Sequence, residues 1–515
     1  MKLLKPGAAA LATVAALFVA ASPAQAQQGQ QGKPTSVFIQ CDGRTGHVDG
    51  GERFLRLLLV SATAGLSETG MSRDDSSKRA RGAAGVAACD QALASERDAY
   101  RRVQLGLARS LHFGEDKRWG EAAAAAHAVS QQLGDKAGDW GLAKSATSAA
   151  RYLEALYLVR AGKIEAGEAA AWDGVRIGGL DVITMQRMAR YTGLSRTISP
   201  QKRAALLIMQ RYLPDSSIRV ANAFAEGGDY AAAAASIRGL DSIIRAFAKE
   251  PTALTGIHSQ LATYAAMSGD LATARSEYAT ARTALEKDRA EGDAASRPTD
   301  FARDEEELAF AEAAIAAAAG DPAQAARLLA ARGSWPNSPP GLVARLVGRV
   351  APLVPDKERL GIVAKGEEVL WREALDARLA VLNRTDGDPK LWGVTGLLAQ
   401  DVGYQRLARN AATGSSARPK WLMKPGKEPR TFDLIAAGVN AQGWEAGEGI
   451  LYHAALIARA RGKQGFVLFP KRTNIDIVGL RFVNAGEFGI PAGSMVMADE
   501  VINELSPHLT AASTR

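Results

Sequence analysis

The 515-residue chain has few of the residues that most often carry catalysis or bind metals. It contains two cysteines and six histidines, and aromatic residues make up only 6% of it. No histidine pair has the H-E-x-x-H spacing, and no cysteine–histidine spacing fits zinc. The nucleophile elbow G-x-S-x-G, the Walker loop and the dinucleotide-binding G-x-G-x-x-G are absent. The sequence therefore predicts no catalytic residue, no cofactor site and no metal site, and it does not indicate an enzyme.

Long apolar runs are also scarce, and the one near the N-terminus has the features of a targeting signal. Lys2 and Lys5 precede an apolar stretch over 7–21, and small residues including Ala26 follow at the positions that signal peptidase reads. We expect a signal peptide over 1–26 with cleavage after Ala26. No later segment has the roughly 18 uninterrupted apolar residues of a membrane helix. The mature chain is therefore expected in a bacterial periplasm, without stable membrane insertion.

Charge of one sign is scarce over most of the chain. The formal net charge is +8, charged residues are 23% of the total, and most lysines and arginines are interleaved with aspartates and glutamates along predicted helices. This pattern is typical of solvated helix faces. Together with the exported address, it argues against a nucleic acid partner and leaves open a weak attraction to anionic lipids or cell-wall polymers.

The two cysteines, Cys41 and Cys89, are expected to pair. In an oxidising compartment two cysteines are more often bridged than free. Closing a loop of about 50 residues would contribute roughly 4 kcal/mol. Two inert thiols are the alternative, and the absence of C-x-x-C argues against a redox function.

What the chain has in quantity is alanine, arranged in short amphipathic segments. The stretch 257–285 predicts two helices joined at 268–270. Leu271, Ala274, Tyr278, Ala281 and Leu285 form one apolar face of the second helix. Gly269 suits a helix end because it tolerates positive φ, and Asp270 suits a helix start because its carboxylate accepts from free backbone N–H groups. Such a hairpin needs neighbours of the same kind to bury its apolar face.

The sequence supplies such neighbours at three further turns. The predicted turn residues are Gly162, Gly228, Asp229, Gly269, Asp270, Gly320 and Asp321. With the small residues Ala262, Ala274 and Ala281 and the aromatic Tyr278, these units resemble degenerate tetratricopeptide repeats, a family of stacked helical hairpins of roughly 34 residues. The family's tryptophan and closing proline are missing and the spacing of the turns is irregular. A generic alanine-rich helical array is the alternative.

These patterns predict a mostly α fold, a TPR-like helical-hairpin superhelix (α-solenoid) with a small C-terminal α+β unit. The expected parts are an N-terminal strand and helix segment (27–118), the helical array (119–411), a linker (412–431) and the α+β domain (432–515). In the first part we expect a strand over Ser36–Gln40, pairing with the C-terminal unit, and a long helix over Lys78–Leu111. Glu286–Glu307 should be an exposed connection, and Pro389–Ala411 a helix. In the last part, Phe432–Val439 and Gly449–Arg461 read as helices, Phe466–Phe469 and Asp476–Asn484 as strands, and Ala498–Leu505 as a closing helix.

Few side chains suggest chemistry beyond packing. Glu445 and Glu448 share a helix face and could serve as general acid and base, but a solvated helix start explains them better. His258 is expected to pack or to lie at the surface. Three tryptophans, Trp335, Trp421 and Trp444, are expected in loops or near the ends of helices. A tryptophan there either anchors a partner or fills a gap in the loop, and we favour the second role.

Two classes of function remain. A stack of hairpins presents a concave surface that suits a protein or peptide partner, so an exported protein-interaction scaffold in the cell envelope is the first hypothesis. The alternatives are a cell-wall-acting envelope enzyme that uses the array as a scaffold, or a purely structural subunit of an envelope complex. A pocket of converging acids or histidines in the C-terminal unit would favour the enzyme.

Overall fold

A computed structural model describes residues 35–45, 75–132, 139–178, 180, 182–247, 254–291, 298–385, 391–396, 398–399, 404, 422–424, 433–436, 444–468 and 477–510. The predicted signal peptide and Ala26 lie outside these residues. Within them the fold is mostly α-helical, with one small antiparallel sheet near the C-terminus, as the sequence predicted. None of the described helices is both long enough and apolar enough to cross a membrane.

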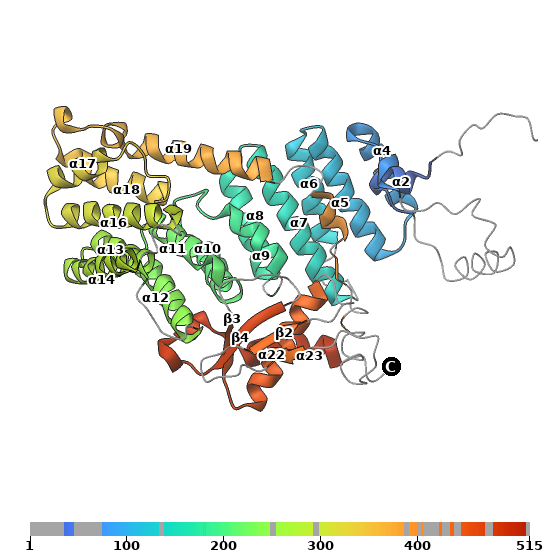
Figure 1. The fold of residues 1–515 in the computed structure, drawn as a ribbon. Coiled ribbons are helices and arrows are strands. Elements are labelled where there is room, and N and C mark those ends of the chain that lie inside the picture. Colours follow the sequence, from blue (N-terminus) through green and yellow to red (C-terminus); the bar gives the residue numbers. More distant parts are fainter. Residues whose placement is uncertain are drawn as a thin grey trace, which may run out of the picture.

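The helices follow one another along the length of the molecule, and most pack on their neighbours in the chain (Figure 1). They are α2 (Val37–Asp42), α4 (Gly82–Ser95), α5 (Ala99–Glu115), α6 (Trp119–Gln132), α7 (Trp140–Arg160), α8 (Ile164–Ile177), α9 (Val182–Met188), α10 (Pro200–Tyr212), α11 (Ser217–Glu226), α12 (Tyr230–Phe247), α13 (Thr255–Ser268), α14 (Leu271–Ala290), α16 (Pro298–Ala318), α17 (Pro322–Ala331), α18 (Pro340–Val350) and α19 (Ile362–Thr385). Short 3₁₀ segments in this part are η2 (Ser76–Lys78), η3 (Ala189–Tyr191), η4 (Pro214–Ser216), η5 (Ala351–Leu353), η6 (Asp356–Glu358) and η7 (Trp392–Gly396).

The predicted glycine–aspartate turns have the expected local geometry. Gly269 ends α13 with φ +89°, and the Asp270 carboxylate accepts from the Thr273 N–H at 3.0 Å at the start of α14. The Asp229 and Asp321 carboxylates each accept in the same way from the backbone N–H three residues later, at 3.0 and 2.9 Å. Gly162, Gly228 and Gly320 also have positive φ. These turns reverse the chain because glycine tolerates the left-handed region and aspartate satisfies free N–H groups.

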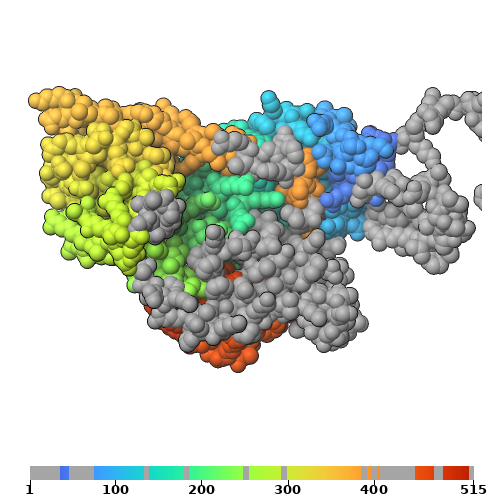
Figure 2. All heavy atoms as spheres, in the orientation of Figure 1, coloured from blue at the N-terminus to red at the C-terminus, as the bar shows by residue number. Residues whose placement is uncertain are grey.

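After α17 the chain turns back over the array. Figure 1 shows α19 running from the α17 end toward the middle of the molecule, and Figure 2 shows its residues along the upper edge. The loop before α18 is filled by Trp335, which is buried and donates from Nε1 to the Leu329 carbonyl at 3.2 Å. This is the gap-filling role expected for that tryptophan. The return of α19 matters because it closes one side of the candidate site.

The C-terminal unit is a five-stranded antiparallel sheet with two helices. The strand order is β1 (Leu422–Lys424), β2 (Asp433–Ala436), β4 (Ile477–Val483), β3 (Gly465–Leu468) and β5 (Val496–Met497). The helices are α22 (Trp444–Ala460) and α23 (Ala498–Thr510), and the 3₁₀ segments are η8 (Glu487–Gly489) and η9 (Ala492–Ser494). Phe466, Val467 and Leu468 are buried, as the apolar run predicted. Val467 packs with Ile243 and Ala246 of α12, which places the sheet against the array.

A buried ion pair joins the array to this unit. Lys144 of α7 donates from Nζ to Glu448 Oε1 of α22 at 2.8 Å and to Glu504 Oε1 of α23 at 2.6 Å. The Tyr404 hydroxyl donates to the second Glu448 oxygen at 2.5 Å. Burial alone would lower the pKa of Lys144, but the carboxylates of Glu448 and Glu504 outweigh it and raise that pKa. Glu448, expected on a solvated helix start, is instead fully buried; the sequence could not show that α7 would cover it.

The N-terminal expectation of a strand is wrong. Ser36–Gln40 begins a helix, α2, whose first turn is capped by the Ser36 hydroxyl and which ends at Gly43 with φ +81°. The β-branched run suggested a strand, but the serine cap and the glycine stop, together with packing on α4 and α5, favour a short helix. The strands β1 and β2, and not residues 36–40, complete the C-terminal sheet.

Two further boundaries differ from expectation. The predicted linker over 412–431 contains β1, and the predicted helix over Phe432–Val439 contains β2, because Leu434 and Ile435 pair with Gly479 and Val478 of β4. Tertiary pairing of this kind overrides local helix propensity. The remaining residues of 412–431 lie outside the described ones.

Three helix limits also changed. The predicted single helix over Lys78–Leu111 is two helices, α4 and α5, separated at 96–98, where Asp98 caps α5 by accepting from the Arg101 N–H at 2.8 Å. The expected connection over Glu286–Glu307 is shorter, because α14 runs to Ala290 and α16 begins at Pro298. Of the helix expected over Pro389–Ala411, the described residues contain η7, and most of the others lie outside them.

Candidate functional site

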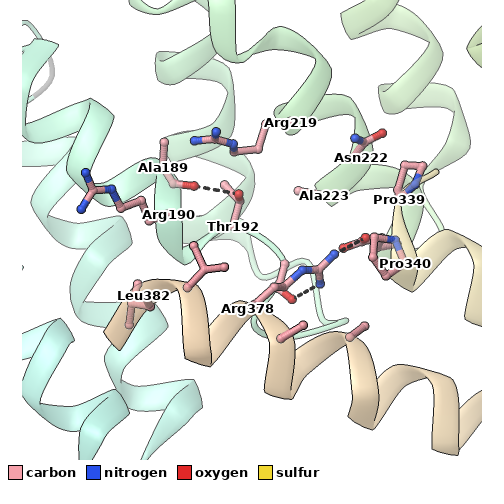
Figure 3. Close-up of a pocket in the computed structure, with 15 residues that line it drawn as sticks. Ala189, Arg190, Thr192, Arg219, Asn222, Ala223, Pro339, Pro340, Arg378 and Leu382 are labelled. Carbon is pink, nitrogen blue, oxygen red and sulfur yellow. Dashed lines mark hydrogen bonds and ion pairs between the residues drawn. The ribbon is translucent and has the colours of Figure 1, made fainter. Parts of the chain in front are cut away.

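A cavity of about 380 Å³ lies where α19 passes over the middle of the array. It is bounded by η3 and the turn after it, by α11, by the start of α18 and by α19 (Figure 3). Its volume falls in the range of roughly 300–1,000 Å³ that is usual for small-ligand sites. We call it the arginine pocket, because Arg190, Arg219 and Arg378 line it together with a single carboxylate, that of Glu226.

One side of the arginine pocket is a buried ion pair. Glu226 is 2% exposed and pairs with the Arg378 guanidinium, which also donates to the Gly193 carbonyl. The same carboxylate accepts from the Gly341 N–H at 3.2 Å, in the first turn of α18. Gly193 is required here: it has φ +76°, and a Cβ would lie 2.7 Å from the Arg378 guanidinium. The pair therefore fixes α11, α18 and α19 relative to one another and neutralises one of the three arginines.

The opposite side of the arginine pocket is lined by the guanidinium groups of Arg190 and Arg219. Arg219 is accessible to solvent and makes no hydrogen bond or ion pair with any residue of the described part of the chain. The walls of the cavity partly desolvate its guanidinium and lower its pKa; Asp215 opposes this effect and Arg190 adds to it. The two guanidinium groups therefore repel each other electrostatically at one cavity, and an anionic ligand would relieve this repulsion.

The remaining wall is apolar and comes mainly from α19. Ala374 and Leu382 are buried, whereas Val381 is 47% exposed at the cavity rim. Pro339 and Pro340 complete the wall from the start of α18. A ligand with an acidic group and a small apolar part would be matched by these surfaces.

A second, smaller cavity of about 60 Å³ adjoins the arginine pocket and shares Asn222 and Pro339 with it. Its walls come from α11, α13, α16 and the 336–339 loop. That loop is held by Glu306, which is 2% exposed and accepts from the backbone N–H groups of Asn337 and Ser338 at 2.8 and 2.9 Å. We call this cavity the polar pocket, because neutral polar side chains and one further carboxyl, Glu307, line it.

Glu307 is a largely buried carboxyl with an incomplete set of partners. Its Oε2 is inaccessible to solvent and has no hydrogen bond. Burial raises the pKa of Glu307 to about 7; Arg303 and Gln260 oppose the rise, and Asp304 and Glu306 add to it. The polar pocket therefore contains an acid that titrates near neutral pH.

Replacing Glu307 by glutamine is expected to remove a pH-dependent loss of stability. A carboxyl whose pKa is higher in the folded state keeps its proton after the unfolded chain has lost it, so stability falls as pH rises from about 4.5 to about 7. The shift corresponds to about 3 kcal/mol. E307Q should be more stable than the wild type by that amount at pH 8, and equal to it near pH 4. Urea unfolding at both pH values measures the difference, with E358Q at the surface as the control. A difference that does not change with pH would contradict this assignment.

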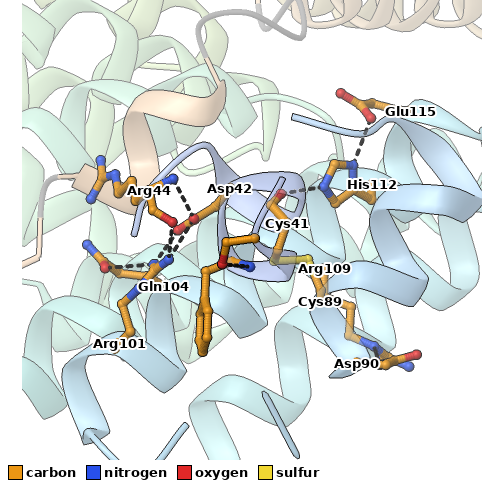
Figure 4. The surroundings of a disulfide bond; sticks show 12 residues. Cys41, Asp42, Arg44, Cys89, Asp90, Arg101, Gln104, Arg109, His112 and Glu115 are labelled. Atoms are coloured by element: carbon orange, nitrogen blue, oxygen red, sulfur yellow. Dashed lines mark hydrogen bonds and ion pairs between the residues drawn. A yellow bond between two sulfur atoms is a disulfide. The ribbon is translucent and has the colours of Figure 1, made fainter. Parts of the chain in front are cut away.

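The two cysteines form the predicted disulfide, with an S–S distance of 2.05 Å. Figure 4 shows it between α2 and α4, beside α5. The Cys41 carbonyl accepts from His112 Nε2 at 2.6 Å, and His112 Nδ1 lies 2.9 Å from Glu115 Oε2. Asp42 accepts from both terminal nitrogens of Arg101. The bridge and these buried polar contacts fix α2 on α4 and α5.

The residues predicted from sequence and the cavities barely overlap. His258, expected to pack or to lie at the surface, is mostly buried and its Nδ1 lies 2.7 Å from Glu277 Oε2. The side chains of Trp421, Trp444 and Glu445 lie outside the described set. The sequence had not indicated any of the three arginines of the pocket as a functional residue. One residue of the pocket, Glu226, did have an unusual position in the sequence. It lies just before the predicted turn at Gly228, at a helix C-terminus, whereas acids are favoured at helix N-termini.

Comparison with protein-family models, with curated proteins and with solved structures found no match to this chain.

Proposed function

We propose that the protein is an exported binding protein of the cell envelope, which holds a peptide or a segment of a partner protein by an acidic group in the arginine pocket. The observation that carries the proposal is Arg219, a guanidinium at a cavity of about 380 Å³ without a hydrogen-bonding partner among the described residues. Arginine presents a planar fork of donors that matches a carboxylate. The apolar wall from α19 would contact the neighbouring part of the ligand.

The proposal includes a TPR-like, solenoid arrangement of the helical array. Four glycine turns, three of them with an aspartate cap, and the packing of successive helices support it. A stack of this kind leaves its surface side chains free to vary without loss of packing, which suits recognition. The predicted signal peptide and the disulfide support the exported location.

The alternative of a cell-wall enzyme has less support. Its best acid in the C-terminal unit, Glu448, has both oxygens engaged, by Lys144 and by Tyr404. A fully buried carboxylate of this kind is better explained as a structural contact between the helical array and the C-terminal unit than as a group that contacts a substrate. The arginine pocket, by contrast, is open to a ligand and contains charge that a ligand would complement.

The test uses N-acetyl-trialanine, which has a free carboxylate, and its C-terminal amide. In titration calorimetry with the full mature chain, the carboxylate form should bind and the amide should bind about 10- to 100-fold more weakly, because a charge-assisted hydrogen bond is lost. R219Q should reduce binding of the carboxylate form by a similar factor.

Arg238, an exposed arginine on α12 away from the cavity, provides the matched control. R238Q has the same change in charge and should bind as the wild type does. Equal weakening by R219Q and R238Q would show that only the net charge matters, and equal binding of the acid and the amide would overturn the proposal.

A further inference from the structure

The polar pocket contains three oxygen atoms that have no hydrogen-bond partner. They are Glu307 Oε2, Gln260 Oε1 and Ser259 Oγ, each inaccessible to solvent. All three residues line the same cavity. Gln260 Oε1 can only accept, Glu307 Oε2 only accepts when the carboxyl is ionised, and the serine hydroxyl can either accept or donate. Leaving buried acceptors without donors is unfavourable, so the cavity is built for a group that donates.

A protonated amino group matches this set of acceptors. It has three N–H donors and a positive charge, which an ionised Glu307 would balance. A cavity of about 60 Å³ accommodates an ammonium group and the carbon that bears it, but not a larger cation such as a guanidinium with its stem.

The position of the polar pocket relates this group to the acidic one. Asn222 on α11 lines both cavities, and Arg219 is on the same helix, three positions earlier. The Tyr264 hydroxyl, from α13, donates to Asn222 Oδ1 at 2.9 Å and so fixes the side chain between the two cavities. A ligand in the arginine pocket therefore has an acceptor-lined cavity directly beside it.

We propose that the polar pocket is a subsite for an ammonium group, and that the two cavities together bind a zwitterionic ligand, an amino acid or a short peptide with free ends. The acidic end lies at Arg219 and Arg190, and the amino end is held by Glu307, Gln260 and Ser259. This rests on the proposed function, since it takes the carboxylate in the arginine pocket as given. It narrows the ligand class from acidic segments in general to short ligands with both charges.

The experiment compares ligands that differ only at the amino end. Alanine, dialanine and trialanine, each free and N-acetylated, are titrated into the full mature chain at pH 7, where their amino groups are largely protonated. At least one free ligand should bind about tenfold or more tightly than its acetylated form, because acetylation removes the charge and two of the donors. The length with the greatest preference reports the separation of the two subsites.

E307Q should abolish the preference for the free amino group and leave binding of the acetylated ligands unchanged, whereas E358Q, at the surface, should alter neither. If acetylated and free ligands bind equally at every length, the polar pocket holds only water and the ammonium subsite is refuted, while the carboxylate site stands. If none of the six ligands binds, the proposed function fails and the subsite with it.

Discussion

Replacing Lys144 by methionine should destabilise the protein by about 3–5 kcal/mol, because it leaves a buried carboxylate without its cation. Glu448 has no solvent-exposed surface, and after the substitution the Tyr404 hydroxyl would be its one remaining hydrogen-bond partner among the residues that the structure describes. Glu504 would lose the same partner but is 44% exposed, so water can replace the lysine there. The free energy of unfolding in urea measures the effect.

The matched control is K163M, a lysine at an exposed turn of the array, which should change stability by less than about 0.5 kcal/mol. The double variant K144M/E448L removes both charges and should recover most of the loss, since an apolar replacement of a buried pair is often neutral. A small effect of K144M, or no recovery in the double variant, would show that the pair does not hold α7 against α22.

Removing the disulfide should lower the stability of the N-terminal helices by about 4 kcal/mol. This is the contribution expected when a bridge closes a loop of about 50 residues and so lowers the conformational entropy of the unfolded chain. Cys41 and Cys89 are fully buried, so the variant C41A/C89A avoids free thiols and changes little in volume. We expect faster hydrogen exchange in α2 and α4 and a lower unfolding midpoint.

The control that separates the effect of the disulfide from that of the substitutions is the reduced wild type. Its backbone amides in α2 and α4 should exchange hydrogen as fast as those of C41A/C89A. A reducing agent should have no effect on the variant. If the variant and the oxidised wild type exchange equally in α2, then the Asp42–Arg101 pair and the His112 contact are sufficient to hold that helix, and the disulfide contributes little.

The turns show how much local sequence can specify. Gly269 and Asp270 satisfy the end of one helix and the start of the next with their own atoms, so the reversal of the chain is readable without knowledge of its surroundings. The disulfide partners were readable for a simpler reason, because a chain with two cysteines has only one possible intramolecular pairing. The apolar run at 466–468 likewise marked a buried strand.

The candidate site was not readable, because its residues come from segments far apart in the chain. Arg190, Arg219 and Arg378 each resemble a surface arginine in sequence, and they meet only because α19 folds back over the array. In sequence, Glu448 resembles a solvated acid, but in the fold Lys144 of α7 packs against it and it is buried. Residues 433–436 resemble a helix in sequence, but in the fold they pair with β4 as a strand. Short-range capping and periodicity act within a few residues and are written in the sequence, so they determined the helical class and the turns. The presence of only two cysteines determined which residues form the bridge. Desolvation, cross-strand pairing and the convergence of charges depend on which surfaces meet, and these only the tertiary structure decided.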